Sequence, residues 1–368
     1  MCKIVDVIRF TQFSDANGRT RRATQFRRRG FTVGPSRIAK EKNKEYIVSK
    51  YCRQRTLRSE IKGNIARRLR TAVEQRGRGL TLTRKWGDRR DATLLRDIDS
   101  MHYIMPLMYP NRCDNEAFIS ETIDLTNAMA FLEKKNAAQP EYRYNIFQII
   151  VTAVLKTITL RPQLNRFIAN YNLYQRNEVS AAFTIKRIFT DAGDEALAFI
   201  HSKPTDTLES VHDEIFRQVS YVRHEGKDQS TESMDALQKI PRVFKKLLGA
   251  GARFLDRRGW MPQSVIATDP YQSSVVLANL GSIKLHSGYH HLTNWGTTSV
   301  FCIIGEMRKR RLPDDEGNET PRMSIDIGLT IDERISDGFY CARSVRLLRK
   351  LLENPELLEQ PLEQPVEY

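Results

Sequence analysis

The chain has 368 residues, 40% of them apolar, and a formal net charge of +15, so it is long enough to bury the core of one large domain or two medium ones. Its most apolar run, residues 147–160, is interrupted by Lys156, which excludes a membrane-spanning helix on composition. Five scattered cysteines without paired or metal-like spacing exclude a disulfide framework, indicate no metal site, and predict a reducing, cytoplasmic environment.

The positive charge belongs to the first part of the chain. Residues 1–80 hold 22 Lys and Arg against 6 Asp and Glu, whereas the other 288 residues hold 37 against 38. We therefore expect a basic, partly disordered leader over residues 1–78, with one helix near 57–75, followed by a neutral domain over residues 79–368. The leader lacks the continuous apolar stretch of a secretory signal.

An Arg-rich leader of this kind has three interpretations. It can bind nucleic acid or an anionic surface by charge alone, it can be an organellar transit peptide, or it can be a poorly ordered extension without a partner. It contains no recognisable nucleic-acid reading motif. Association with nucleic acid would therefore rest on charge and fall steeply with salt.

From Leu80 onward the sequence alternates strand and helix patterns, which predicts one α/β domain of mixed topology. The clearest helix covers 146–159, and it ends before Arg161-Pro162 because proline disfavours helical geometry in the residue ahead of it. In chain order we expect a turn or short helix at 92–99, a strand at 103–108, a loop at 110–115, a strand at 121–125, helices at 126–135 and 146–159, a strand at 179–187, helices at 208–224 and 240–256, strands at 274–277, 299–306 and 323–330, and a helix after Gly338.

The most informative segment is Ile331-Asp-Glu-Arg-Ile-Ser-Asp-Gly338, where the last strand meets the last helix. Asp337 can cap that helix, and an Asp-Gly pair at such a place also fits ordinary turn chemistry. With His in place of Glu333 the segment would be His-x-x-x-Asp-Gly, so it resembles the catalytic signature of the chloramphenicol acetyltransferase superfamily. The helix would bury Ala342, Val345, Leu348 and Leu352 and expose Arg343, Arg346 and Lys350.

Four further segments resemble segments of the same superfamily and occur in the same order, over roughly residues 80–360. The most similar branch is the acyltransferase core of 2-oxo acid dehydrogenase complexes. The fold that this implies is an α/β, chloramphenicol acetyltransferase-like two-layer sandwich with a mixed sheet, preceded by the basic leader. The segments are Trp86-Gly-Asp-Arg89-Arg90 (a Trp-x-Arg-Lys element), Ala153 to Asn165 (a helix with a Pro-x-Leu-Asn turn), Ala278-Asn279-Leu280-Gly281 (Asn-Leu-Gly), and Gly305 to Arg310 (a strand end with a basic turn).

The resemblance implies a CoA-dependent acyltransferase that moves an acyl group from acyl-CoA to a small thiol, hydroxyl or amine acceptor. In the family the substrates meet in a channel between the subunits of a trimer, so a homotrimer is implied. No Asp-Lys-Ala hairpin and no Ala-Pro-rich linker occurs, so we expect no lipoyl group on this chain.

The resemblance also assigns roles to residues. Glu333 takes the position of the general base, and Asp337 pairs with Arg89, or with Arg90, to hold the catalytic loop. Ser282 or Ser287 steadies the oxyanion from the facing subunit. The coenzyme A-binding positions are Asn279, Gly281 and Gly338.

Replacing His by Glu weakens the base. A thiol of pKa about 8.5 lies about 2 units above His and about 4 above Glu, so Glu costs about 3 kcal/mol more in driving force, roughly a hundredfold in rate. Burial of Glu333 in an apolar channel would raise its pKa and recover most of that loss. Contact with Arg334 would lower it instead.

Three histidines crowd one loop, and more than one role is open to them. His286, His290 and His291 lie in the segment expected to reach the neighbouring subunit, where one of them would replace the missing imidazole. They also fit a polar surface loop or a metal site, although no further ligand cluster is visible. The sequence thus leaves three functions open, namely an acyltransferase, a catalytically silent trimer that binds a ligand or scaffolds partners, and nucleic-acid association through residues 1–78.

Overall fold

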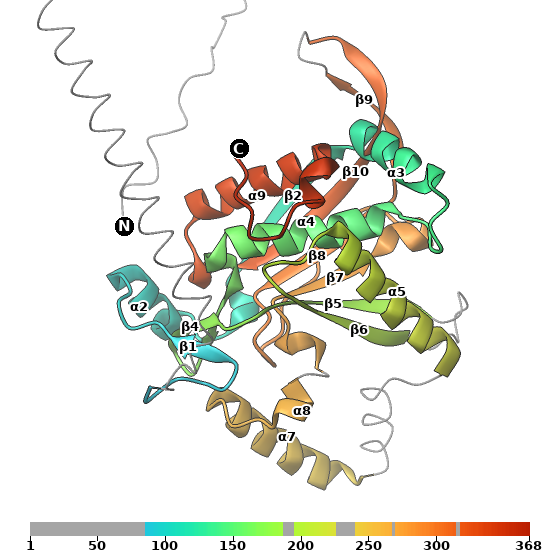
Figure 1. The fold of residues 1–368 in the computed structure, drawn as a ribbon. Helices are drawn as coiled ribbons and strands as arrows, with labels where there is room; N and C mark the ends of the chain where they lie inside the picture. The colour runs from blue at the N-terminus through green and yellow to red at the C-terminus, as the bar shows by residue number, and fades with distance from the viewer. Residues whose placement is uncertain (1–84, 187–194, 226–239, 267–268, 314–316) are drawn as a thin grey trace, which may run out of the picture. The chain divides into compact units, whose positions relative to one another are not determined.

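A computed structural model describes residues 85–186, 195–225, 240–266, 269–313 and 317–368 (Figure 1). The predicted leader, its helix near 57–75 and its proposed nucleic-acid contacts lie outside these residues. Within them, the chain forms a seven-stranded mixed sheet with helices packed on one face, together with a small three-stranded sheet. The predicted α/β class with a mixed sheet is confirmed.

The larger sheet combines parallel and antiparallel pairs. β7 runs parallel to its two neighbours, β5 and β8, and every other pair in this sheet is antiparallel. In spatial order its strands are β2 (Glu116–Asp124), β10 (Glu319–Asp332), β8 (Val300–Ile304), β7 (Val275–Asn279), β5 (Val179–Lys186) and β6 (Glu195–Ser202), with β9 (Arg308–Pro313) paired to the first half of β10. The smaller sheet has the order β1 (Ala92–Leu94), β4 (Asn172–Arg176) and β3 (Arg166–Ala169).

The helices are α2 (Ser100–Met108), α3 (Thr126–Ala137), α4 (Ile146–Leu160), α5 (Leu208–Glu225), α7 (Arg242–Arg257), α8 (Gln263–Ile266) and α9 (Gly338–Glu353). Of these, α3, α5 and α9 pack around α4, which is apolar on nearly every side. No helix in the described ranges has the length and hydropathy needed to cross a membrane.

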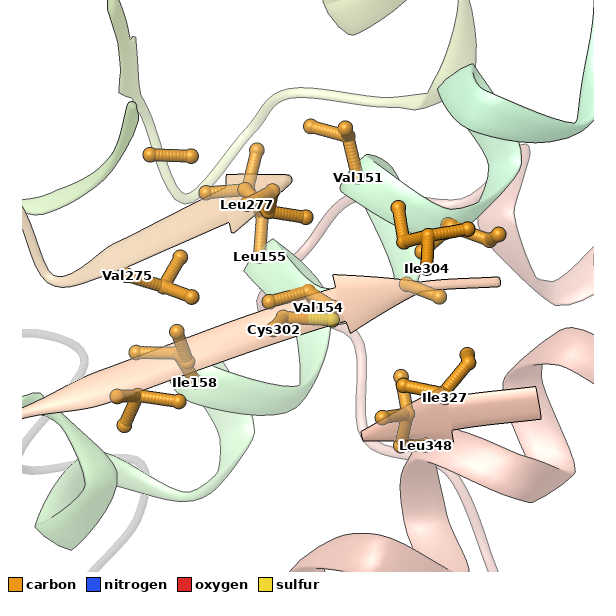
Figure 2. Close-up of a cluster of buried hydrophobic side chains, with 14 of the residues drawn as sticks. Val151, Val154, Leu155, Ile158, Val275, Leu277, Cys302, Ile304, Ile327 and Leu348 are labelled. Atoms are coloured by element: carbon orange, nitrogen blue, oxygen red, sulfur yellow. The ribbon is translucent and has the colours of Figure 1, made fainter. Parts of the chain in front are cut away.

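Strict alternation along the central strands decides which side chains meet the helices. Val275 and Leu277 on β7 and Cys302 on β8 point toward α4, where they pack with Val154 and Leu155 (Figure 2). The residues between them point to the opposite face, because successive side chains of a strand alternate. There they form a second cluster of buried residues, Ala182, Val276, Leu292, Phe301 and Ile303.

The first and last residues of α4 follow from local chemistry. Asn145 and Gln148 form a reciprocal capping box at its start, and the helix ends at Leu160, ahead of Arg161-Pro162 as expected. Lys156 lies fully buried in this helix. Its ammonium group donates to the carbonyl oxygens of Leu357, Gln360 and Pro361 at 2.9, 3.2 and 2.8 Å, which fixes the C-terminal segment against the helix.

Some sequence predictions were wrong. Residues 103–108, predicted as a strand, belong to helix α2, because the Asp99 carboxylate accepts from the N–H groups of Met101 and His102 and caps it. The stretch 92–99 contains strand β1 instead of a short helix. Ala342 is exposed on α9, whereas Val345, Leu348 and Leu352 are buried as predicted.

Four strands, β3, β4, β6 and β9, had no counterpart in the predictions. Asn170 was a sequence signal for the β3–β4 hairpin. In the structure its two turn residues, Asn170 and Tyr171, have φ of 46° and 64°. Two successive positive φ values are typical of the type I′ hairpin turn, in which Asn is favoured.

Candidate active site

The signature turn at residues 331–338 is built around one buried ion pair. Nε and Nη2 of Arg334 donate to the two carboxylate oxygens of Asp332 over 2.8 and 2.7 Å. Asp332 is 0% exposed and Arg334 is 1% exposed. Nη1 of Arg334 also donates to the carbonyl oxygens of Tyr109 and Pro110 at 2.9 and 3.1 Å. The turn is therefore fixed to the loop that precedes β2.

A second buried cation, Arg112, completes this group, which we call the Asp332 cluster (Arg112, Asp332 and Arg334). Its Nε lies 3.6 Å from an Asp332 oxygen, and Nη1 donates to the carbonyl oxygens of Thr293 and Gly296 at 2.7 and 3.1 Å. Burial lowers the pKa of Arg112 to about 10, and the charge of Asp332 acts against that shift. Sequence analysis missed Arg112, because it lies in a predicted loop with no motif around it.

Glu333 lies between the two buried members of the ion pair and is itself exposed. Its backbone N–H donates to the Asn115 carbonyl oxygen at 2.9 Å, while its carboxylate has no hydrogen bond or ion pair among the described residues. Arg334 points to Asp332, so the contact between Arg334 and Glu333 that the sequence left open is not made. Burial of Glu333 does not arise within one copy of the chain either.

Asp337 caps α9 as predicted, with Oδ1 accepting from the Tyr340 N–H at 2.7 Å. The expected pairing of Asp337 with Arg89 is wrong. Arg89 is buried beside the small sheet, where Nε lies 2.9 Å from Asp91 and Nη1 donates to the Asp256 carbonyl oxygen at 2.5 Å. Arg90 is exposed and does not pair with Asp337 either.

Because Asp337 acts only as a cap among the described residues, we expect Asp337→Ala to lower the free energy of unfolding by about 1 kcal/mol. Asp337→Ser keeps a capping oxygen and should change it by only a few tenths of a kcal/mol. Urea unfolding of both variants tests this. A loss of about 3 kcal/mol in Asp337→Ala would instead indicate a buried ionic partner.

Two of the predicted oxyanion and coenzyme-binding residues, Gly281 and Ser282, lie in the 3-10 turn Leu280–Ile283, and Asn279 is the last residue of β7 before it. The Ser282 hydroxyl donates to the Asn279 carbonyl oxygen at 2.7 Å, and its N–H donates to the Asn279 side chain at 3.2 Å. A Cβ at Gly281 would lie 2.5 Å from the Gly305 carbonyl oxygen, so only glycine fits there. Gly338 is the first, exposed residue of α9 and has no such constraint.

Asn279 and Ser282 line a cavity of about 870 Å³ between the amino end of α4, α5 and the ends of β5 and β7. Its wall mixes apolar and polar groups. The other side chains in contact with it include Phe147, Phe183, Phe216, Arg143, Asn145 and Gln148.

The histidine loop crosses the sheet face opposite α4, where two glycines allow its close approach. A Cβ at Gly305 would lie 2.5 Å from the Ser287 nitrogen, and one at Gly328 would overlap the Gly288 carbonyl. The Ser287 hydroxyl donates to the Ile303 carbonyl oxygen at 3.3 Å. This crossing places His286 beside Glu306 and Arg308, and it places His290 over Phe301, whose partner Thr330 lies three residues before Glu333.

The three histidines contact residues of the sheet and of their own loop. His286 is exposed and lies 3.2 Å from both Glu306 and Arg308. The His290 ring stacks on Phe301 at 4.2 Å and on His291 at 4.6 Å, and its Nδ1 lies 2.8 Å from the His291 carbonyl oxygen. Across the part of the chain that is described, no three His, Cys, Asp or Glu residues gather in a way that could hold a metal ion.

The two halves of the predicted site lie at opposite ends of the sheet. Asn279 pairs with Ile304 on β8, which pairs with Ile327 on β10, five residues before Asp332. A strand rises about 3.3 Å per residue, so Asp332 in the signature turn lies about 16 Å along β10 from Ile327, which is level with Asn279 across the sheet. One copy of the chain does not bring Glu333 and Ser282 together.

Comparison with known proteins identifies no family by sequence: no family model matches the chain, and no curated protein does. Solved structures that align with it include dihydrolipoamide acetyltransferase of Azotobacter vinelandii (14% identity, 72% of this chain and 93% of that one, TM-score 0.49). They also include a chloramphenicol acetyltransferase (13%, 73% and 99%, 0.43) and the first condensation domain of the CDA synthetase (9%, 72% and 51%, 0.36).

The identities are low and these TM-scores are below 0.5, so the alignments say nothing of activity. Three predicted elements are present in the predicted order. They are helix α4 with its Pro-x-Leu-Asn turn, strand β10 that ends in the Asp-Glu-Arg turn, and the capped helix α9. The described residues form an α/β fold with a mixed sheet.

Proposed function

We propose that the protein is a CoA-dependent acyltransferase that works as a homotrimer, with Glu333 as the general base. The observation that carries this proposal is the presentation of Glu333. The turn buries a charged residue on each side of it and leaves its own carboxylate exposed without a partner in the described chain. A rigid support around one free functional group suits a reactive side chain.

The separation of Glu333 and Ser282 supports a site shared between copies. A facing copy would place the end of its sheet that carries Ser282 and the 870 Å³ cavity against the signature turn of the first copy. The apolar wall of that cavity, with Phe147 and Phe183, fits the acyl arm of acyl-CoA, and Arg143 fits its anionic part. Covering Glu333 at such an interface would also remove water from the carboxylate, which favours its protonated form.

The reaction would proceed in two steps, attack on the thioester and release of CoA. Glu333 takes the proton of the acceptor thiol, hydroxyl or amine as that atom attacks the thioester carbon. The tetrahedral intermediate then collapses, the carbon–sulfur bond breaks, and the departing CoA sulfur receives the proton from Glu333. The Ser282 hydroxyl, which donates to Asn279 in a single copy, has to rotate to donate to the oxyanion.

Isothermal titration of the full chain with CoA and acetyl-CoA, followed by an assay of thiol release, tests the proposal. We expect binding, and we expect Glu333→Gln to lower turnover by about a hundredfold, in the range of general-base catalysis. Glu319→Gln, an exposed carboxylate at the other end of β10, is the matched control and should retain turnover.

Turnover that survives in Glu333→Gln would transfer the base role to His286, His290 or His291. A second candidate, the catalytically silent trimer, is favoured by the Ser282 hydroxyl, which is already engaged with the Asn279 carbonyl oxygen. It predicts binding without turnover, or no binding of either compound. Nucleic-acid association through residues 1–78 stays a prediction, which deletion of that segment tests.

A further inference from the structure

Helix α7 presents its apolar face to solvent. Val243, Phe244 and Leu247 are 76%, 62% and 71% exposed, and Leu248 and Phe254 are about half exposed. These residues recur at helical spacing and form one continuous stripe. We call the stripe, with Leu255, the α7 apolar face.

The opposite side of α7 fastens the helix to the body of the protein. Asp256 is buried there, where its carboxylate accepts from the Gln272 side chain at 2.9 Å and lies 3.7 Å from Arg89. The Asp256 carbonyl oxygen accepts from Arg89 as well. On a helical wheel Lys245, Gly249 and Ala252 share this side, and all three are partly buried. The side with Asp256 therefore attaches the helix to the rest of the described domain, and the α7 apolar face is left exposed to a binding partner.

Cations flank the α7 apolar face, and they have no exposed anion on their own helix to balance them. Arg242, Lys246, Arg253 and Arg257 lie along one border, and the only acid of the helix is the buried Asp256. At the carboxyl end Arg258 packs over the rings of Phe254 and Trp260, at 4.2 and 5.5 Å. Trp260 itself is about half exposed.

Three of these arginines also converge on a hollow beside the apolar face. Arg253, Arg257 and Arg258 line a cavity of about 450 Å³ together with Phe254 and Asn170. Arg253 and Arg257 have no acidic partner in the parts of the chain that are described. A hollow of this composition suits a phosphate group, because guanidinium groups bind phosphate oxygens in pairs.

We infer that α7 binds an anionic phospholipid surface, with its apolar face in the acyl boundary and its arginines at the headgroups. An amphipathic helix with Phe, Leu and Trp on one face and Lys and Arg on the border is the type that lies in the plane of a membrane interface. Each Lys or Arg near an anionic leaflet adds to the attraction.

Two other occupants fit the helix less well. A second copy of the same face would place Arg and Lys borders against each other without a counter-charge, which disfavours self-pairing. Nucleic acid would satisfy the cations but would leave Val243, Phe244 and Leu247 in water. An anionic lipid surface is the partner whose chemistry matches both the apolar face and its borders.

Vesicle flotation of the full chain tests the inference, with phosphatidylcholine vesicles that contain or lack phosphatidylglycerol. Leu247→Glu places one negative charge on the apolar face, and Tyr221→Glu, on the exposed side of α5, is the control with the same change of charge. Both proteins keep the basic leader, so a difference between them reports on α7 alone. Since a buried Leu contributes about 1.5–3 kcal/mol, we expect Leu247→Glu to bind anionic vesicles at least about tenfold more weakly than Tyr221→Glu.

Circular dichroism and thermal unfolding should be the same for the two variants, because both sites are exposed. Equal vesicle binding by the two would overturn the inference and assign any binding to another part of the chain. Equal binding with a lower oligomeric state of Leu247→Glu, measured by light scattering, would show that α7 joins copies of the chain. Neither result depends on whether the protein is an acyltransferase.

Discussion

Asp332→Asn is expected to lower the free energy of unfolding by about 4 kcal/mol, in the range found when one partner of a buried ion pair is removed. The variant would leave Arg334 and Arg112 buried without their counter-charge. Asn keeps the size of Asp and one acceptor oxygen, so the loss would report on charge and not on a cavity. Urea or thermal unfolding measures the change.

The neighbouring carboxylate provides a matched control for Asp332→Asn. Glu333→Gln makes the same chemical change one residue later, at an exposed side chain with no partner in the described chain, and should alter stability by less than about 0.5 kcal/mol. Equal effects of the two substitutions would contradict the Asp332 cluster. Glu333→Gln is also the variant that tests turnover, because it is expected to leave stability nearly unchanged.

Lys156→Met should lower the free energy of unfolding by about 3 kcal/mol, because three carbonyl oxygens of the C-terminal segment lose a charged donor. Met matches the length of the Lys stem, so the core around α4 stays filled. The segment 355–362 should become accessible to protease before the rest of the protein unfolds. Lys134→Met, an exposed change on α3, is the control.

The stability of the protein should also depend on pH through Lys156. Burial lowers the pKa of Lys156 to about 8, whereas a Lys in an unfolded chain titrates near 10.4. Between these values the unfolded chain binds more protons than the folded one, so the contribution of this group to stability rises with pH across that window and is lost as pH falls through 8. Lys156→Met should lack this rise. A rise of the same size in the variant would assign it to other groups.

The helices and most central strands could be predicted because their signals are local. The capping box at Asn145, the Pro162 stop and the alternation on β7, β8 and β10 each depend on residues within a few positions of one another. The cap at Asp337 was predicted for the same reason. Helix α2 was missed because the prediction did not use the cap that Asp99 provides at its start.

The candidate site was predicted only in part. The position of Glu333 at the end of a strand followed from the motif, whereas its exposure and the direction of Arg334 did not. Arg112 could not be found in advance, since its partners lie more than 50 residues away along the chain. The pairing of Arg89 was predicted wrongly because sequence order does not show which of several carboxylates a buried Arg will meet.

The sequence by itself determined that this chain folds as an α/β domain with a strand–turn–helix element around Glu333, because caps, turns and side-chain alternation are set by neighbouring residues. Only the tertiary structure decided that Arg89 meets Asp256, that Ser282 and Glu333 lie at opposite ends of one sheet, and that α7 turns its apolar face outward. These features depend on strand order and on the packing of residues far apart in the chain. Local spacing carries no information about either.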